Sequence, residues 1–154
     1  MPREDFDFQQ GRWRVAHRRL KDRLVGCTDW EEFAGTSEMR LILGGNGNLE
    51  DNCLDISTGT YRAVALRSYD SATATWAIWW LDGRSPHALD VPVVGRFEHG
   101  VGVFYAEDTL NGTPIRVRFH WLDTTTDHPR WEQAMSLDDG VSWEINWTME
   151  FRRE

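Results

Sequence analysis

One group of side chains in the sequence has the chemistry to bind an anion and move a proton. It comprises Arg96, Tyr105, Glu107, Arg116, Arg118 and His120. Guanidinium groups bind carboxylates and enolates through paired hydrogen bonds, and a nearby Tyr or His can transfer a proton. Tyr105, Arg118 and His120 are therefore the candidate catalytic residues. The alternative is a solvated outer face, on which Glu107 pairs with Arg116 and Tyr105 stacks on Arg118.

A second group could form a pocket for a hydrophobic or aromatic molecule. It comprises Trp80, Phe104, Phe119, Trp121, Trp131, Gln133 and Trp147. Ligand pockets are mostly apolar with a few polar anchors, and Gln133 is the polar member of this group. The alternative is that these rings fill a core and enclose only one another. Asp82 and Arg84 either gate the mouth of such a pocket or form a local ion pair in a turn.

Strands must position both groups, because apolar and polar residues alternate along most of the chain and turn residues interrupt the alternation. Ten strands are predicted, at residues 11–21, 33–43, 47–56, 60–69, 74–82, 92–98, 101–110, 113–122, 130–137 and 141–152. Residues 3–10 are the candidate for a short helix. Ten strands with one apolar face each close most economically into a barrel without free edges. We therefore predict an all-β fold, an antiparallel up-and-down barrel of about ten strands, in a single domain over residues 1–154.

Turn residues also predict which side chains face each other across the hairpins. A two-residue turn at Asn111-Gly112 aligns Tyr105 with Arg118 and Val103 with His120. A two-residue turn at His99-Gly100 would align Val103 with position 96 on the preceding strand. These registers separate an apolar face from the face that carries the Arg, Tyr and His residues.

The hairpin around Asp138-Asp139-Gly140 fits a three-residue loop with Gly in the left-handed conformation. This loop aligns Trp131 with Trp147 and places Trp143 on the same aromatic face, with Asn146 on the opposite polar face. The chain has 9 Trp among 154 residues. Because each large ring buries about 150–250 Å², the aromatic faces must point into one interior or into a subunit interface.

The composition excludes several classes of protein. The chain has 17 Lys+Arg against 25 Asp+Glu, a net charge of −8, which argues against nucleic acid as the partner. No apolar run approaches the roughly 20 residues that span a bilayer, so no membrane partner is expected. The start, MPREDFDFQQ, lacks a basic segment followed by an apolar one, which predicts a cytoplasmic protein. The histidines and cysteines show no metal-type spacing, so no metal site is expected.

Several segments resemble a known family. Phe6-Asp7-Phe8 followed by Gly11-x-Trp13 resembles the start of calycin-type barrels, which are the lipocalins and their relatives. The blocks 66–85, 93–121 and 130–151 are similar to a group of functionally uncharacterised bacterial proteins with a lipocalin-like, nitrobindin-like barrel. The resemblance covers nearly the whole chain. It implies a β-barrel and often a dimer, and it implies no settled activity.

The nitrobindin branch of these barrels binds haem, and a glycine-rich run after Gly-x-Trp is its hallmark. Here Arg14-Val15-Ala16-His17 follows instead, so the resemblance does not imply haem and no cofactor is expected. The leading hypothesis is a homodimeric barrel that binds a small hydrophobic or aromatic molecule. One alternative is an enzyme, such as an isomerase, cyclase or lyase, that uses the Arg/Tyr/His group in the same cavity. Another is a structural or interaction module with a filled core.

Overall fold

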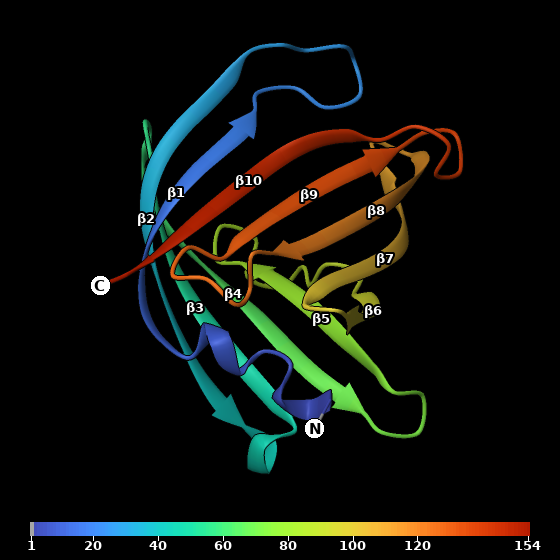
Figure 1. Ribbon diagram of the computed structural model, residues 1–154. Coiled ribbons are helices and arrows are strands. Elements are labelled where there is room, and N and C mark those ends of the chain that lie inside the picture. The colour runs from blue at the N-terminus through green and yellow to red at the C-terminus, as the bar shows by residue number, and fades with distance from the viewer. Residues whose placement is uncertain (1) are drawn as a thin grey trace.

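The structure, a computed structural model, describes residues 2–154. It is a closed antiparallel barrel in which each strand pairs with its neighbours in sequence and β1 closes the barrel against β10 (Figure 1). The strands are β1 (Gly11–Leu20), β2 (Trp30–Ile42), β3 (Gly47–Ile56), β4 (Gly59–Asp70), β5 (Thr75–Asp82), β6 (Val93–Glu98), β7 (Val101–Leu110), β8 (Thr113–Leu122), β9 (Arg130–Ser136) and β10 (Glu144–Arg153). The prediction of an all-β, ten-stranded up-and-down barrel is confirmed.

Two hairpins have the registers that their turn residues predict. Both residues of His99-Gly100 and both of Asn111-Gly112 have positive φ, between 50° and 81°. This is the backbone of a two-residue turn whose twist matches that of the flanking strands. The first turn aligns Arg96 with Val103, and the second aligns Val103 with His120. Local turn chemistry therefore sets the register of β6, β7 and β8.

The register predicted between β9 and β10 is wrong. Trp147 pairs with Gln133 rather than with Trp131, and a β-bulge interrupts the ladder between Ile145 and Trp147. β10 begins only at Glu144, so the connection is longer than a three-residue loop. The extra residues shift the pairing and change which side chains of β10 face the interior.

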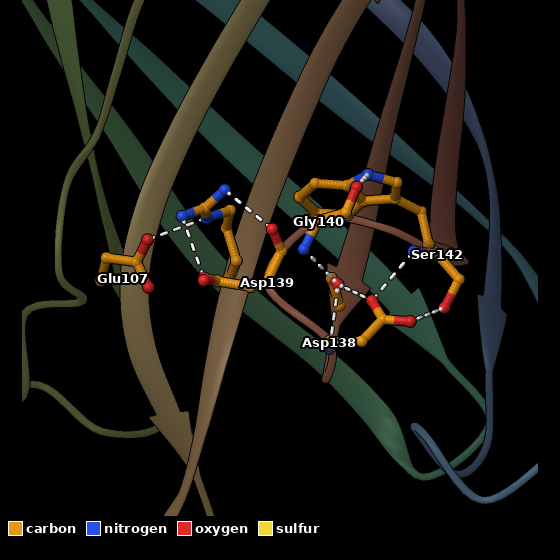
Figure 2. A network of polar contacts seen from close by, with 8 residues as sticks. Glu107, Asp138, Asp139, Gly140 and Ser142 are labelled. Carbon is orange, nitrogen blue, oxygen red and sulfur yellow. Dashed lines mark hydrogen bonds and ion pairs between the residues drawn. The ribbon is translucent and has the colours of Figure 1, made fainter.

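Asp138 stabilises this longer connection (Figure 2). Its carboxylate accepts hydrogen bonds from the hydroxyl of Ser136 (2.7 Å) and from both the backbone N–H (2.8 Å) and the hydroxyl of Ser142. Arg116, on β8, donates to the carbonyl and the carboxylate of Asp139, each at 3.1 Å. Because these contacts extend the loop beyond its predicted end, Trp143 lies outside the strand.

The N-terminal segment closes one end of the barrel (Figure 1). In place of the short helix considered for residues 3–10, it forms two 3₁₀ turns, η1 (Pro2–Glu4) and η2 (Asp7–Gln9); a third, η3 (Leu43–Gly45), connects β2 to β3. The buried ring of Phe6 lies edge-on to Trp76 and Phe97, with centroid distances of 5.0 and 4.8 Å. These contacts tie the segment to the barrel core.

A buried ion pair fills the same end. Arg67 donates to the carboxylate of Glu50 and to Oδ1 of Asn48 (3.0 Å), and the two charged side chains are each 3 % exposed. The guanidinium lies 4.6 Å from the ring centre of Phe6 and 5.4 Å from that of Trp121. Packed rings and a paired charge therefore leave this end of the barrel as a filled core.

Candidate functional site

The other end of the barrel contains a cavity of about 330 Å³. Five of the seven residues predicted to bind a ligand line it: Trp80, Phe119, Trp131, Gln133 and Trp147. A smaller space of about 20 Å³ lies deeper, bordered by three of these aromatic residues and by the buried pair of Glu50 and Arg67. The barrel is therefore filled at one end and hollow at the other.

The remaining two predicted residues lie outside the main cavity. Trp121 borders only the smaller space, and Phe104 is fully buried in the filled end, where its ring stacks 6.0 Å from that of Phe6. Gly102 makes room for rings here, since a Cβ at this position would lie 2.8 Å from both Phe97 and Phe104. Alternation identified the inward face correctly, but it contains no information on depth along the barrel axis.

The aromatic residues of the cavity form a wall of rings that meet edge to face. Trp147 lies perpendicular to both Trp80 and Trp131, with centroid distances of 5.6 and 5.3 Å and interplanar angles of 89°. Phe119 meets Trp131 at 5.0 Å. Aromatic rings prefer this geometry because the positive ring edge meets the negative ring face. Although Trp131 and Trp147 are not paired across the ladder, their rings still pack together as diagonal neighbours.

Gln133 is the polar group within this wall. Its Nε2 donates to Oδ1 of Asn146 at 2.8 Å, and the two side chains are 8 % and 0 % exposed. The prediction that Asn146 lies on the outer polar face is therefore wrong, because the bulge in β10 turns this residue inward. The hydrogen bond holds the Gln133 amide in place against the cavity.

His17, a residue not predicted for the site, orients one of the rings. Trp147 donates from Nε1 to Nδ1 of His17 at 3.1 Å, and the imidazole stacks on Phe33 at 4.6 Å. Burial, together with the nearby charge of Arg19, lowers the pKa of His17 to about 3. His17 is therefore neutral near pH 7, with its proton on Nε2 and its Nδ1 available as the acceptor for Trp147.

Charged side chains surround the mouth of the cavity. Arg19 donates to the hydroxyl of Tyr61 (2.9 Å) and to the carboxylate of Glu31 (3.3 Å). Arg84 lies 3.6 Å from the centre of the Tyr61 ring and makes paired hydrogen bonds to Asp82, at 3.1 and 2.8 Å. Asp82 and Arg84 therefore form the predicted local ion pair and also border the cavity.

Two loops complete the mouth, one after β1 and one after β5. Arg23 belongs to the first loop, where the backbone N–H of Leu24 donates to the carboxylate of Glu144 at 2.7 Å. Asp90 belongs to the second loop, and its backbone N–H donates to the carbonyl of Trp80 at 3.0 Å. These hydrogen bonds attach both loops to the strands that carry the aromatic wall.

The candidate catalytic residues Tyr105, Arg118 and His120 lie on the outer face of the barrel, and the idea that they share the cavity is wrong. Tyr105 is 46 % exposed and packs 6.0 Å from the Trp143 ring, and Arg118 lies 4.4 Å above the same ring. Nδ1 of His120 lies 3.1 Å from the Glu132 carboxylate. Strand alternation explains the placement, since the residues between them on β7 and β8 face inward.

The remaining members of the Arg/Tyr/His group also lie on the solvated outer face, which was the alternative to a catalytic site. Glu107 accepts a hydrogen bond from Arg116 at 2.8 Å, as predicted for a cross-strand ion pair (Figure 2). Arg96 is exposed on the same side of the sheet. In place of the predicted stack of Tyr105 on Arg118, both side chains contact Trp143, which belongs to the longer β9–β10 connection.

Sequence reasoning named Asp82 and Arg84 at the mouth but missed His17, Arg19, Arg23 and Asp90, for identifiable reasons. His17 and Arg19 share the inward face of β1 with Trp13, so the two-residue period was an available signal. Arg23 and Asp90 lie on loops, whose positions depend on contacts with distant strands. No periodic pattern identifies such residues.

The fold and the cavity define a class of protein, a closed ten-stranded antiparallel barrel with an aromatic-lined cavity at one end. Neither the models of known protein families nor the curated proteins match this chain. Residues 2–154 contain no cluster of three or more His, Cys, Asp or Glu side chains that could hold a metal ion. Within the same residues, no helix is long and apolar enough to cross a membrane.

Proposed function

We propose that this protein binds a small hydrophobic or aromatic molecule in the cavity of the barrel. The observation that supports this function best is the wall of four aromatic rings around a space of about 330 Å³. This volume lies at the lower end of the roughly 300–1,000 Å³ that is typical of small-molecule sites, so the ligand is expected to be small. Gln133 supplies the polar anchor.

The unfilled space itself favours a ligand over a purely structural role. Side chains that border a void lose the dispersion contacts that neighbouring atoms would make. Trp147 packs against both Trp80 and Trp131, and all three rings also border the cavity. An apolar molecule of matching size would restore these contacts.

A neutral aromatic probe, 2-naphthylacetamide, tests this function by isothermal titration calorimetry and by tryptophan fluorescence. We expect saturable binding with a change in emission, because three Trp line the cavity. Phe119→Leu removes one ring of the wall and should weaken the affinity by about 3- to 10-fold. The control, Tyr105→Leu, removes a ring of the outer face and should leave the affinity unchanged.

Absence of binding would favour the alternative of an interaction module. The proposed function fails if the probe and a wider panel of aromatic and lipid-like molecules change neither the heat of mixing nor the emission. Equal losses of affinity in Phe119→Leu and Tyr105→Leu would also contradict it, since the outer face would then contribute as much as the cavity. An enzyme that acts in this cavity would use residues of its wall or mouth, because Tyr105 and Arg118 lie on the outer face.

We propose that the chain is related to the calycin-type barrels, that it forms a homodimer, that it is cytoplasmic and that neither nucleic acid nor a membrane is its partner. The net charge of −8 supports the exclusion of nucleic acid. A red-shifted Soret band on titration with hemin would contradict the expectation that the barrel has no haem site.

A further inference from the structure

We propose that the ligand of this cavity carries an anionic group, such as a carboxylate, and that Arg23 binds this group at the mouth. The inference rests on the proposed function, because it concerns the polar end of a molecule whose apolar body contacts the aromatic wall. The inference comes from comparing three guanidinium groups at the mouth, two of which have protein partners in direct contact while the third has none.

Two of the three guanidinium groups already have protein partners. Arg84 is held by the paired hydrogen bonds to Asp82 and by the ring of Tyr61 beneath it. Arg19 donates to Tyr61 and Glu31, and its guanidinium also lies 4.9 Å from the ring centre of Trp147. Both side chains are therefore fixed parts of the mouth.

Arg23 differs from these two because it makes no hydrogen bond or ion pair with any residue that the structure describes. It is only partly exposed, and it lines the cavity together with the aromatic wall. Burial, followed by the charge of Arg19, lowers the pKa of Arg23, yet a guanidinium stays protonated near neutral pH. The carboxylates of Asp90 and Glu144 attract this cation, but neither lies within hydrogen-bond or ion-pair distance of it. A ligand anion in direct contact would therefore offset the partial loss of water better than these carboxylates do.

The shape of the guanidinium group favours a carboxylate in particular. Its planar fork of N–H donors matches the two oxygens of a carboxylate, and such paired bonds are among the stronger hydrogen bonds in proteins. Arg23 and the rings of Trp80 and Trp147 border the same cavity. A ligand with an aromatic or aliphatic body and a short acidic arm would therefore reach both.

Asp90 is the group at the mouth that would favour the opposite charge. Its side chain is exposed, so that water solvates its carboxylate, whereas Arg23 is partly buried. Burial of part of the carboxylate, followed by the charges of Asp108 and Asp82, raises the pKa of Asp90, and the positive charge of Arg23 opposes this rise. Water solvates the charge of the exposed Asp90 carboxylate more than that of Arg23. A ligand cation would therefore gain less binding free energy at Asp90 than a ligand anion would gain at Arg23.

Three probes of similar shape and different charge test the proposal: 2-naphthylacetate, the neutral 2-naphthylacetamide and the cationic 2-(2-naphthyl)ethylamine. We expect the acetate to bind the native protein about tenfold more tightly than the amide at low salt, and the amine to bind most weakly. Added salt should reduce the affinity for the acetate and leave that for the amide nearly unchanged.

Two variants locate the effect. Arg23→Gln should abolish the preference for the acetate while retaining the affinity for the amide, and Arg23→Lys should retain part of the preference. The matched control is Arg18→Gln, which removes a positive charge from the outer face of β1, where Arg18 pairs with Glu32 at 3.6 Å. This control should keep the full preference.

The outcomes separate this inference from the proposed function. If the native protein binds the acetate and the amide equally, the anion site is wrong and the binding function stands. If the amine binds most tightly, Asp90 rather than Arg23 selects the ligand. If none of the three probes binds, the anion site is wrong, and if the wider panel of aromatic and lipid-like molecules also fails to bind, the proposed function itself fails. The native protein alone decides whether the cavity prefers an anion. If Arg23→Gln does not fold, the reduced preference expected for Arg23→Lys assigns the anion to Arg23 rather than to Arg19 or Arg84.

Discussion

At the scale of the residue, His17 shows how one buried side chain sets the shape of the cavity wall. The indole N–H of Trp147 needs an acceptor inside the barrel, and neutral His17 provides it at 3.1 Å. A proton on Nδ1 would break this hydrogen bond and place a second cation beside Arg19. Neutral His17 and the orientation of Trp147 therefore depend on each other.

This dependence predicts how stability varies with pH. The pKa of His17 is lowered from an ordinary value of 6.5 to about 3 in the folded state. Between these two values the unfolded chain binds a proton that the folded protein does not bind, so stability decreases as the pH falls below 6.5. The contribution of this one group is about 1.4 kcal/mol per pH unit, or about 2 kcal/mol from pH 7.5 to 5.0.

Urea denaturation of the native protein and of His17→Gln, at pH 7.5 and 5.0, measures this contribution. The variant should lose about 2 kcal/mol less than the native protein over this range. His87→Gln, a change in the exposed loop after β5, serves as the control and should behave like the native protein. A loss that is the same in native protein and His17→Gln would show that His17 does not couple folding to pH.

At the scale of the element, the connection between β9 and β10 determines which residues of β10 face the cavity. The carboxylate of Asp138 organises this connection through bonds to Ser136 and Ser142 (Figure 2). The hydrogen bonds from Ser142 and Ser136 lower the pKa of Asp138 to about 2. The β-bulge follows this connection directly. The conformation of the connection therefore influences which way Asn146 and Trp147 point.

Asp138→Ala removes the acceptor that organises this connection. We expect the melting temperature to fall by a few degrees, about 2–4 °C, and the amide protons at the start of β10 to exchange faster with solvent. Asp127→Ala, an equal loss of charge in the exposed β8–β9 connection, is the matched control. Unchanged exchange in Asp138→Ala would mean that the bulge, rather than the loop, sets the register of β10.

At the scale of the whole molecule, the barrel has an uncharged apolar strip on its outer surface as well as an apolar interior. Leu66, Trp79, Val94 and Tyr105 lie on neighbouring strands of this surface, from β4 to β7. In a symmetric dimer the same surface of each chain meets itself. Because the net charge is −8, contact through an uncharged strip avoids the repulsion that charged faces would cause. We therefore place the proposed homodimer interface here.

A charged substitution in this strip should separate the two chains. We expect the native protein to have the mass of a dimer in light scattering after gel filtration, and Trp79→Glu to have the mass of a monomer that still binds the naphthyl probes. Trp30→Glu, on the outer face of β2 beside Arg18, is the control and should remain dimeric. A native protein that is monomeric at micromolar concentration would contradict the homodimer, and a dimeric Trp79→Glu would place the interface elsewhere.

Most of the barrel and part of the site followed from the sequence. Five cavity residues were predicted because strand alternation places Trp80, Phe119 and their partners on the inward face. Phe104 shares that face but lies in the end of the barrel that the N-terminal segment fills, where the ring of Phe6 packs against it. The mouth was largely missed, since Arg23 and Asp90 come from loops about 67 positions apart (90 − 23) in the sequence.

Local interactions explain what the amino-acid pattern was able to specify. The ten strands and the β6–β8 register depend on alternation over a few residues and on turns such as Asn111-Gly112, whose conformations need no distant partner. The bulge that turns Asn146 inward, the hydrogen bond of Trp147 to His17 and the unpaired Arg23 depend on contacts between segments far apart in the chain. Closure of the barrel creates those contacts, and closure therefore determines where the cavity lies and what charge surrounds its mouth.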